Sequence, residues 1–460
     1  MTGGPASDAV PSAELVLAHA GQLVTARAGG GGGMSAGGAS DAGGARGAGG
    51  AGGARGARGA SGADLEALEV IQDGAVAIAD GQVVEVGASA DLIGRHAGAE
   101  VVDVEGRLVT PGFVDCHVHL VHGGSRHAEY DRKIRGLPPT GEPTGIAATM
   151  AHTAATSDDQ LRRRALADLD VMLAHGTTTT EAKTGYGGGA AGELRLLRLT
   201  RELTHAVTVV PTFLGAHALP PERADDPDGF VDEIIAAMPA ARAHARFFDV
   251  FCDPLGFDLG RAERLLAAAI AAGFQLKVHA DQTADVGATG LAAGMRAVSI
   301  DHADYASPDA IDALVDAGTV AVLLPGVAHH LGELTPDLTG AVAKPQLPEQ
   351  AARLVDAGAV VALSTDYNPG TSPTRSMQTV LQLAVRMFRL PAAAVWHMAT
   401  INAAHALDVA DERGSLEPGK AADIVVWDVE DHQMVTNRFG TNLVHAVYKD
   451  GRAVVAPRSA

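Results

Sequence analysis

The stretch FVDCHVHL at residues 113–120 decides how the rest of the chain is interpreted. Residues two apart on a β-strand point to the same side, so the side chains of His117 and His119 are expected to project together. Two imidazoles on one face, at the end of an apolar strand, supply half of the ligands of a first-row metal site. The alternative is a pair of polar residues that simply end a strand, and the rest of the chain must decide between the two.

The composition restricts the classes of protein to be considered. The chain has 460 residues, of which 47% are hydrophobic, enough for a large core, and a formal net charge of −20. That charge argues against a nucleic acid or an anionic membrane as partner, but it allows a local cationic pocket for a small acid. Cys116 and Cys252 provide no disulfide framework, and we find no signal peptide or membrane-spanning run. We expect a cytoplasmic protein.

A repeated strand–helix pattern begins at residue 113, and each apolar segment in it ends in polar residues. The expected strands span residues 113–119, 177–183, 207–217, 247–252, 275–281, 297–302, 319–325 and 360–366. Helix boundary signals separate them, such as the capping box of Ser157 and Gln160, and Ser307-Pro308 before a helix that Gly318 ends. Eight such units predict a (β/α)8 barrel over residues 110–407.

The two ends of the chain predict a second, smaller domain, a β-sandwich built from residues 1–109 and 408–460. Strand patterns at 13–26, 68–72 and 74–87 include an Asp80-Gly81 hairpin turn, and residues 414–428 and 443–454 are typical of turns and edge strands. Residues 28–63 are nearly all Gly, Ala, Ser and Arg. Such a segment cannot bury enough apolar surface to offset its ordering entropy, so we expect a disordered insertion, with a functional tail as the alternative.

Polar side chains stand at the predicted ends of most barrel strands, where barrel enzymes have their active sites. These residues are His117, His119, Lys183, His217, His279, His302 and Asp366. Zinc and iron sites of hydrolases combine imidazole with carboxylate, so we predict that the metal ligands are His117, His119, His279 and Asp366. Asp366 can accept a proton from an activated water, and His302 can polarise the substrate or shuttle a proton.

Several motifs resemble those of the amidohydrolase superfamily. They are TPGFVDCHVH at 110–119, KVH at 277–279, IDH at 300–302, STD at 364–366 and the Gly-Lys-rich segment 414–428. The resemblance implies hydrolysis of a C–N or related bond by a metal-activated water in a barrel of this type.

A second set of motifs resembles the imidazolonepropionase family within that superfamily. They are GGSR at 123–126, EAKTGYG at 181–187, TFLGAH at 212–217, DVFC at 249–252, TVAVLLPG at 319–326 and TDYNPGT at 365–371. The resemblance implies conversion of 4-imidazolone-5-propanoate to N-formimidoyl-L-glutamate in histidine degradation, with one zinc or iron ion per subunit, in a homodimer.

Residues near the predicted ligands suit a small anionic ring. The planar fork of Arg126 can pair with a carboxylate. Tyr186 and His217 can bind the ring or the carboxylate, and Gln282 can hydrogen-bond ring nitrogens or the activated water. The opened product can be held by the segment after Asp366, through Asn368, Gly370 and Thr371.

Some alternatives stay open at this point. Gln282 stands where many family members have Glu and cannot take a proton, so the general base would be Asp366 or His302. Lys183 could be a carbamylated ligand that bridges two metals, and His122, His329 and His330 could alter substrate preference. Other functions to consider are a deaminase or cyclic-amide hydrolase acting on a related heterocycle, and a catalytically inactive scaffold. A scaffold would have no need of a complete metal site.

Overall fold

The computed structural model describes residues 12–29, 59–138, 140–336 and 340–457. Most of the predicted disordered insertion, residues 30–58, lies outside the described residues. Its last residues differ from the prediction, because Ala60 is buried against the barrel. The amide group of Ala60 donates to Asn402 Oδ1 at 2.9 Å, and its carbonyl accepts from Asn402 Nδ2 at 2.9 Å. The amide of Asn402 thus replaces strand pairing and orders a segment that composition alone would leave disordered.

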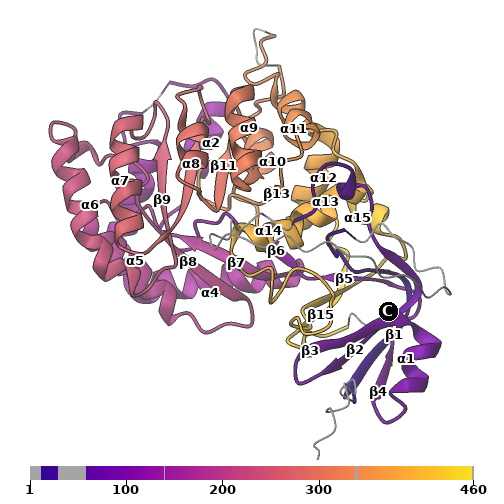
Figure 1. Ribbon diagram of the computed structural model, residues 1–460. Coiled ribbons are helices and arrows are strands. Elements are labelled where there is room, and N and C mark those ends of the chain that lie inside the picture. The colour runs from indigo at the N-terminus through magenta and orange to yellow at the C-terminus, as the bar shows by residue number, and fades with distance from the viewer. Residues whose placement is uncertain (1–11, 30–58, 139, 337–339, 458–460) are drawn as a thin grey trace, which may run out of the picture.

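The eight predicted barrel strands are all present and run parallel in chain order (Figure 1). They are β6 (Phe113–Asp115), β7 (Thr177–Lys183), β8 (Thr208–Ala216), β9 (Phe247–Cys252), β10 (Gln275–Ala280), β11 (Ser299–His302), β12 (Val320–Leu323) and β13 (Val361–Leu363). Strand β6 is shorter than predicted, so His117 and His119 lie just beyond its end.

Helices connect the strands and cover the outside of the barrel (Figure 1). The main ones are α4 (Asp158–Ala174), α5 (Ala190–Glu202), α6 (Pro227–Arg242), α7 (Leu259–Ala271), α8 (Ala288–Gly294), α9 (Pro308–Ala317), α10 (Pro325–His330), α11 (Leu347–Asp356), α12 (Met377–Met387), α13 (Ala392–Ala399) and α14 (Ile401–Ala406). The predicted boundary signals are confirmed, since Ser157 and Gln160 form the capping box of α4, Ser307 caps α9, and Gly318 ends α9 at φ +67°. Within the described ranges, no helix combines the length and apolar character that crossing a membrane requires.

Two further helices, α2 (His127–Ile134) and α3 (Gly145–Ala155), lie in the long connection between β6 and α4. Arg126 directly precedes α2 at its N-cap position. This connection leaves the barrel from the same strand that supplies His117 and His119, so α2 and α3 belong to the rim that carries the predicted site.

Asp115 joins the first and last barrel strands. It is fully buried, and it accepts the backbone N–H of Thr365 at 2.9 Å, the Thr365 hydroxyl at 2.7 Å and the Ser364 hydroxyl. Burial raises the pKa of Asp115 to about 6 even with these donors. The junction holds the residues after β6 against those after β13, and it thereby brings His117 close to Asp366.

Both ends of the chain form the smaller domain, as predicted (Figure 1, lower right). Its strands are β1 (Leu15–Val24), β2 (Val70–Ala79), β3 (Gln82–Ala88), β4 (Glu100–Asp103), β5 (Leu108–Pro111), β14 (Ile424–Trp427), β15 (Val444–Lys449) and β16 (Arg452–Val455). Four short helices complete the described fold. Helix α1 (Ser89–Arg95) packs on β1, β2 and β3, whereas η1 (Gly62–Leu65) and α15 (His432–Asn437) contact α13 of the barrel, and η2 (Pro221–Arg223) follows β8.

The pairing of these strands refines the prediction of a sandwich. The strands follow the order β16-β15-β14-β5-β1-β2-β3 in one hydrogen-bonded sheet, and β4 branches off β1. Asp80 and Gly81 make the predicted turn, both with positive φ. The prediction of edge strands near the C-terminus holds for β16 alone. It was wrong for β14, which lies between β5 and β15, and for β15, which lies between β14 and β16, because their apolar residues are buried in the core of this domain.

Candidate active site

The four predicted metal ligands converge at the end of the barrel where the strands terminate. Asp366 Oδ1 lies 3.4 Å from His117 Nε2 and 3.6 Å from His119 Nε2. The ring of His279 lies 4.4 Å from that of His117, measured between centroids. His302 also lies close to these ligands. One ring nitrogen from each of His117, His279 and His302 lies within 4.8 Å of the other two, so the three could hold one metal ion.

The unpaired atoms of this group fit a bound metal ion. His117 Nε2, His279 Nε2 and Asp366 Oδ1 are buried and have no hydrogen-bond partner among the described residues. Buried polar atoms without partners are costly, and a divalent cation would satisfy all three at once. Burial disfavours a charged His117, yet the carboxylates of Asp301 and Asp366 raise its pKa to about 9, so this position attracts positive charge.

Hydrogen bonds behind the imidazoles select the nitrogen that faces the site. His117 Nδ1 donates to Asp301 Oδ2 at 2.7 Å, and His279 Nδ1 donates to Asp249 Oδ1 at 3.2 Å. His119 Nδ1 donates to the carbonyl of Thr184 at 3.3 Å. Since these acceptors cannot donate, each Nδ1 carries a proton, and Nε2 is the nitrogen of each ring that would bind a metal ion, as in known metal sites.

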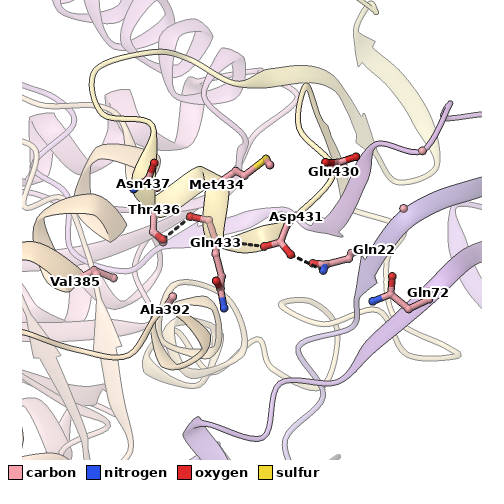
Figure 2. Close-up of a pocket in the computed structure, with 12 residues that line it drawn as sticks. Gln22, Gln72, Val385, Ala392, Glu430, Asp431, Gln433, Met434, Thr436 and Asn437 are labelled. Carbon is pink, nitrogen blue, oxygen red and sulfur yellow. Dashed lines mark hydrogen bonds between the residues drawn. The ribbon is translucent and has the colours of Figure 1, made fainter.

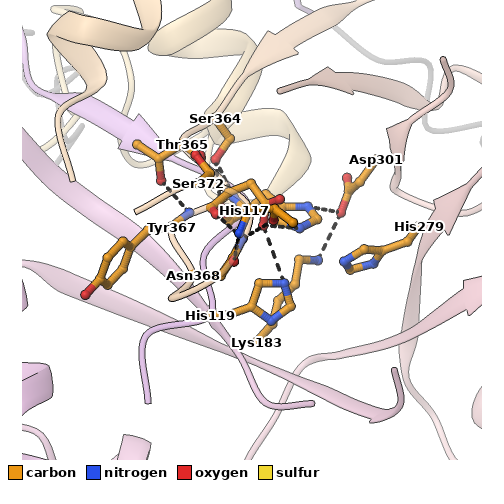
Figure 3. Close-up of polar contacts among 12 residues, drawn as sticks. His117, His119, Lys183, His279, Asp301, Ser364, Thr365, Tyr367, Asn368 and Ser372 are labelled. Atoms are coloured by element: carbon orange, nitrogen blue, oxygen red, sulfur yellow. Dashed lines mark hydrogen bonds and ion pairs between the residues drawn. The ribbon is translucent and has the colours of Figure 1, made fainter. Parts of the chain in front are cut away.

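A buried group of charges supports these carboxylates, and we name it the support cluster: Lys183, Glu181, Asp249, Asp301 and Lys277. The ammonium of Lys183 lies 2.6 Å from Asp249 Oδ2 and 3.2 Å from Glu181 Oε2. It also lies 3.0 Å from Asp301 Oδ2 (Figure 3). Lys277 binds the other oxygen of Glu181 at 3.0 Å. The cluster therefore fixes both carboxylates that orient His117 and His279.

The surroundings of Lys183 favour a free ammonium group over the carbamylated metal ligand considered above. Burial alone would lower its pKa, but Asp249, Asp301 and Glu181 raise that pKa well above its ordinary value. The ammonium is thus favoured, and a carbamate would place another negative charge among three carboxylates. Sequence reasoning missed Asp249 and Asp301 as supporting residues, although a charged residue inside a short apolar strand was a usable signal.

A small pocket opens beside the ligands. It is lined by His119, Arg126, Ile146, Tyr186, His217, Phe251, His279, Gln282, His302, Asp366, Asn368 and Thr371. Sequence reasoning had proposed most of these residues, but it gave no signal for Ile146 or Phe251. Gly370 is not one of the lining residues, but it lies directly behind one of them, since a Cβ atom on it would stand 1.8 Å from Arg126 Nη1.

The pocket wall combines neutral hydrogen-bonding groups with one permanent cation. Burial and the nearby His279 lower the pKa of His217 to about 3, and burial with His279 and His117 lowers the pKa of His302 well below its ordinary value. Burial likewise raises the pKa of Tyr186, which keeps its hydroxyl protonated. Among the lining residues, Arg126 alone carries a permanent positive charge.

Backbone conformation also directs two side chains into the site. His302 and Asp366 have φ values of +77° and +48°, a left-handed region that residues other than glycine seldom adopt. Both lie at the ends of barrel strands, where this bend turns the side chain from the strand direction toward the metal ligands. Such conformations persist only where surrounding structure enforces them, and they concentrate at functional sites.

Asn368 has a different environment from the one predicted. Its Nδ2 donates to the carbonyl of Asp366 at 2.7 Å and to Thr371 Oγ1 at 2.8 Å. Its Oδ1 accepts the backbone N–H groups of Gly370 at 2.8 Å and Thr371 at 2.7 Å. The amide is therefore used within its own loop, and its part in the site is to shape the segment that carries Gly370 and Thr371.

The additional histidines do not line the pocket. His122 is buried and packs near the rings of Tyr186 and Tyr367, at 6.2 and 5.7 Å between centroids. His329 is exposed, whereas His330 stacks on Tyr130 of α2 at 3.9 Å. Their place on the barrel rim follows the sequence prediction, but none is positioned to touch a ligand in the pocket.

A second cavity lies at the junction of the small sheet with α13 and α15 (Figure 2). Its lining includes Gln22, Gln72, Glu430 and Asp431, and Gln22 donates to Asp431 at 2.7 Å. The cavity is lined by neutral and acidic residues, without a histidine or a cation. It therefore offers neither an imidazole ligand for a zinc or iron ion nor a cationic partner for an anionic substrate.

Comparisons with known proteins agree with this geometry. Residues 108–454 match the model of the amidohydrolase family. The chain is 38% identical over 403 residues to an imidazolonepropionase of Bacillus velezensis, covering 86% of this chain and 93% of that protein. It is 41% identical over 401 residues to an imidazolonepropionase of Geobacillus kaustophilus, covering 84% and 91%.

More distant solved structures share the fold. An adenosine deaminase from Xanthomonas campestris with bound zinc has a TM-score of 0.62 at 17% identity, covering 97% of this chain and 94% of that one. Guanine deaminase from E. coli has a TM-score of 0.65 at 16% identity, covering 96% and 99%. These likenesses concern the fold alone, whereas the two curated relatives match closely over most of their length. The chain belongs to the amidohydrolase family and, within it, to the imidazolonepropionases.

Proposed function

We propose that this chain hydrolyses 4-imidazolone-5-propanoate to N-formimidoyl-L-glutamate. The observation that carries the proposal is one pocket in which a buried His/Asp metal-binding group faces a single permanent cation, Arg126. In a substrate with a small polar ring and a carboxylate, the ring would face the metal-binding group and the carboxylate would face Arg126. The two relatives described above are named imidazolonepropionases, and this chain matches more than nine-tenths of the length of each. Their names support the same reaction.

His117, His119, His279 and Asp366 would hold one zinc or iron ion. When bound, such an ion supplies a Lewis acid that makes a water molecule acidic enough to attack near neutral pH. The support cluster prepares the ligands for this, because Asp301 and Asp249 accept the Nδ1 hydrogens of His117 and His279 and leave Nε2 of each ring facing the position where the ion would bind.

Arg126 would bind the substrate carboxylate and so fix the orientation of the ring. The Tyr186 hydroxyl can donate a hydrogen bond to the carbonyl oxygen of the substrate or to a nitrogen of its ring. His217 donates its Nδ1 hydrogen to the carbonyl of Gly185 at 3.2 Å, so its Nε2 can accept a ring N–H. Gln282 lines the same pocket and can donate or accept through its amide.

The proton transfers would fall to Asp366 and His302. A water molecule adds to the carbonyl carbon of the ring and loses a proton, and the bond from that carbon to the ring nitrogen then breaks. The carbon becomes a carboxylate, and the nitrogen takes up a proton. Asp366 is the first candidate to accept and return the proton, with neutral His302 beside it, since Gln282 cannot serve as a base.

Three further expectations stay predictions. We propose a homodimer, a cytoplasmic location, and a division of the chain into a barrel at 110–407 with a composite domain from 1–109 and 408–460. Size-exclusion chromatography with light scattering would test the first of these, because a monomeric mass in solution would contradict it.

The reaction is tested with freshly generated 4-imidazolone-5-propanoate and metal-loaded full-length protein. We expect loss of the ultraviolet absorbance of the ring, appearance of N-formimidoyl-L-glutamate by mass spectrometry, and loss of both signals with a chelator. Absence of turnover by metal-loaded protein would contradict the proposal. Release of ammonia from a purine or pyrimidine in its place would instead indicate a deaminase.

A further inference from the structure

We infer that Glu129 is a positioning residue that holds the guanidinium of Arg126 with one edge turned toward the substrate carboxylate. The inference rests on the proposed function, because it assigns Arg126 to that carboxylate. Glu129 contacts both Arg126 and the start of α3, Gly370 limits the space around Arg126, and the guanidinium keeps donors that Glu129 does not use.

The first contact is a two-point ion pair. Arg126 Nε donates to Glu129 Oε2 at 3.0 Å, and Arg126 Nη2 donates to Glu129 Oε1 at 2.6 Å. The pair spans the first turn of α2, where the two residues stand three positions apart. Two parallel bonds fix the plane and the rotation of a guanidinium, which a single bond cannot do.

The second contact fixes Glu129 itself. Both of its carboxylate oxygens face the backbone N–H of Gly145, the first residue of α3, at 3.4 and 3.2 Å. The hydrogen bonds from Arg126 lower the pKa of Glu129, so the carboxylate stays ionised near neutral pH. Glu129 therefore links Arg126 to both α2 and α3, and its own carboxylate is held in place by the backbone of α3.

The third constraint is steric. Gly370 lies against the Nη1 end of Arg126, where a Cβ atom would stand 1.8 Å from Nη1 and 2.4 Å from Cζ. Only a residue without a side chain leaves room for the guanidinium in this position. Gly370 comes from the loop that Asn368 shapes, so the far end of the guanidinium is set by the same segment that borders the pocket.

The donors that remain define the open edge. A guanidinium has five N–H groups, and Glu129 uses one on Nε and one on Nη2. Two on Nη1 and one on Nη2 remain, and the edge between Nη1 and Nη2 can accept a second carboxylate in the same two-point manner. A pre-oriented edge spares the substrate the ordering cost of a mobile arginine and therefore lowers KM.

The pair is partly buried: the side chain of Arg126 is 14% exposed and that of Glu129 is 31% exposed. Such a pair contributes less to stability than a fully buried one, so we expect the variants to fold, and circular dichroism checks this. Glu349 offers a matched control, because it makes an ion pair with Arg353 at 2.7 Å on α11, away from the pocket.

The test uses full-length, metal-loaded protein as wild type, Glu129→Gln, Arg126→Ala, the double variant and Glu349→Gln. Each is assayed with 4-imidazolone-5-propanoate and with 5-ethyl-4-imidazolone, which keeps the ring and lacks the carboxylate. We expect Glu129→Gln to raise KM for the propanoate about tenfold, with kcat within about twofold, a loss that corresponds to about one hydrogen-bonded contact. It should leave the ethyl compound unaffected, and Glu349→Gln should match wild type.

The double variant separates positioning from a direct or structural role. If Glu129 acts through Arg126, Glu129→Gln adds nothing to the KM of Arg126→Ala. An unchanged or lower KM in Glu129→Gln, an equal loss with the ethyl compound, or additive losses in the double variant would overturn the inference while Arg126→Ala still raises KM. Failure of wild type to turn over the propanoate, or a normal KM in Arg126→Ala, would overturn the assignment of Arg126 and the inference with it.

Discussion

The support cluster and the rim of this barrel are both built from ion pairs, but they differ in burial. Lys183, Asp249 and Asp301 are fully buried, and each carboxylate has more than one partner. At the rim, Arg126 and Glu129 are partly exposed and bind mainly each other. Removing one member of a buried pair costs about 3–5 kcal/mol, whereas an exposed pair contributes about 1 kcal/mol or less.

This difference assigns separate tasks to the two layers. The buried layer keeps the metal ligands in one tautomer and one position, so it should govern metal binding. The rim leaves part of the Arg126 guanidinium open to a ligand, so it should govern recognition of the substrate carboxylate. Substitutions should therefore separate metal content from KM, and the following predictions proceed from the largest expected effect to the smallest.

The largest effect is expected for His279→Ala. Loss of one ligand from the buried group should lower kcat/KM by more than about 10³-fold, because the activated water depends on the metal. Metal content by elemental analysis should fall together with activity. The exposed His244 provides the control, and equal losses in His244→Ala, or full metal content in active His279→Ala, would contradict the assignment of His279.

Asp301→Asn should weaken metal binding without removing a ligand. The substitution replaces the anionic acceptor that orients His117 with a neutral amide, a weaker acceptor, and removes one carboxylate partner of Lys183. Loss of such a supporting partner typically lowers metal affinity about 10- to 100-fold. Competition with a chelator measures this, circular dichroism checks the fold, and Asp312→Asn on the surface of α9 is the control. Wild-type metal affinity in Asp301→Asn would show that the support cluster is not needed.

Arg126→Ala should affect substrate binding alone. We expect KM for 4-imidazolone-5-propanoate to rise about 100-fold, in line with the loss of a charge-assisted pair worth about 1.5–3 kcal/mol. Metal content should equal that of wild type. Steady-state kinetics and elemental analysis on the same preparation provide both values, and a fall in metal content would contradict the separation of the two layers.

His330→Phe should have the smallest effect. His330 stacks on Tyr130 and lies outside the pocket, and phenylalanine preserves that stacking. We expect kcat/KM to change by less than about threefold, within the range of an aromatic contact of about 0.5–1.5 kcal/mol that is largely retained. A change in preference between related cyclic amides would instead show that the rim histidines tune the substrate.

Sequence patterns predicted the barrel and the metal-binding group because both depend on local periodicity. The His117–Val118–His119 alternation and the polar ends of successive strands are visible in the chain. In a closed parallel barrel, all strand ends meet at one rim, so the convergence of His279 and Asp366 follows from topology. The helix boundaries were predicted for the same reason, since Ser157 and Gly318 act within one turn.

The parts that sequence did not predict depend on contacts between distant segments. Asp301 supports His117 across 184 positions of the chain, and no spacing rule reveals such a pair. Asn368 looked like a ligand residue because amides bind ligands, but its loop uses both of its polar atoms. Ala60 is held by two hydrogen bonds to Asn402, 342 positions away in the chain, which no local pattern reveals.

The most direct test of this division of tasks is one experiment on wild type, His279→Ala and Arg126→Ala, with metal content and the kinetics of 4-imidazolone-5-propanoate hydrolysis measured on the same samples. We predict that His279→Ala loses metal and turnover together, whereas Arg126→Ala keeps its metal and shows a raised KM. Metal loss in Arg126→Ala, or metal-independent turnover by His279→Ala, would contradict the account.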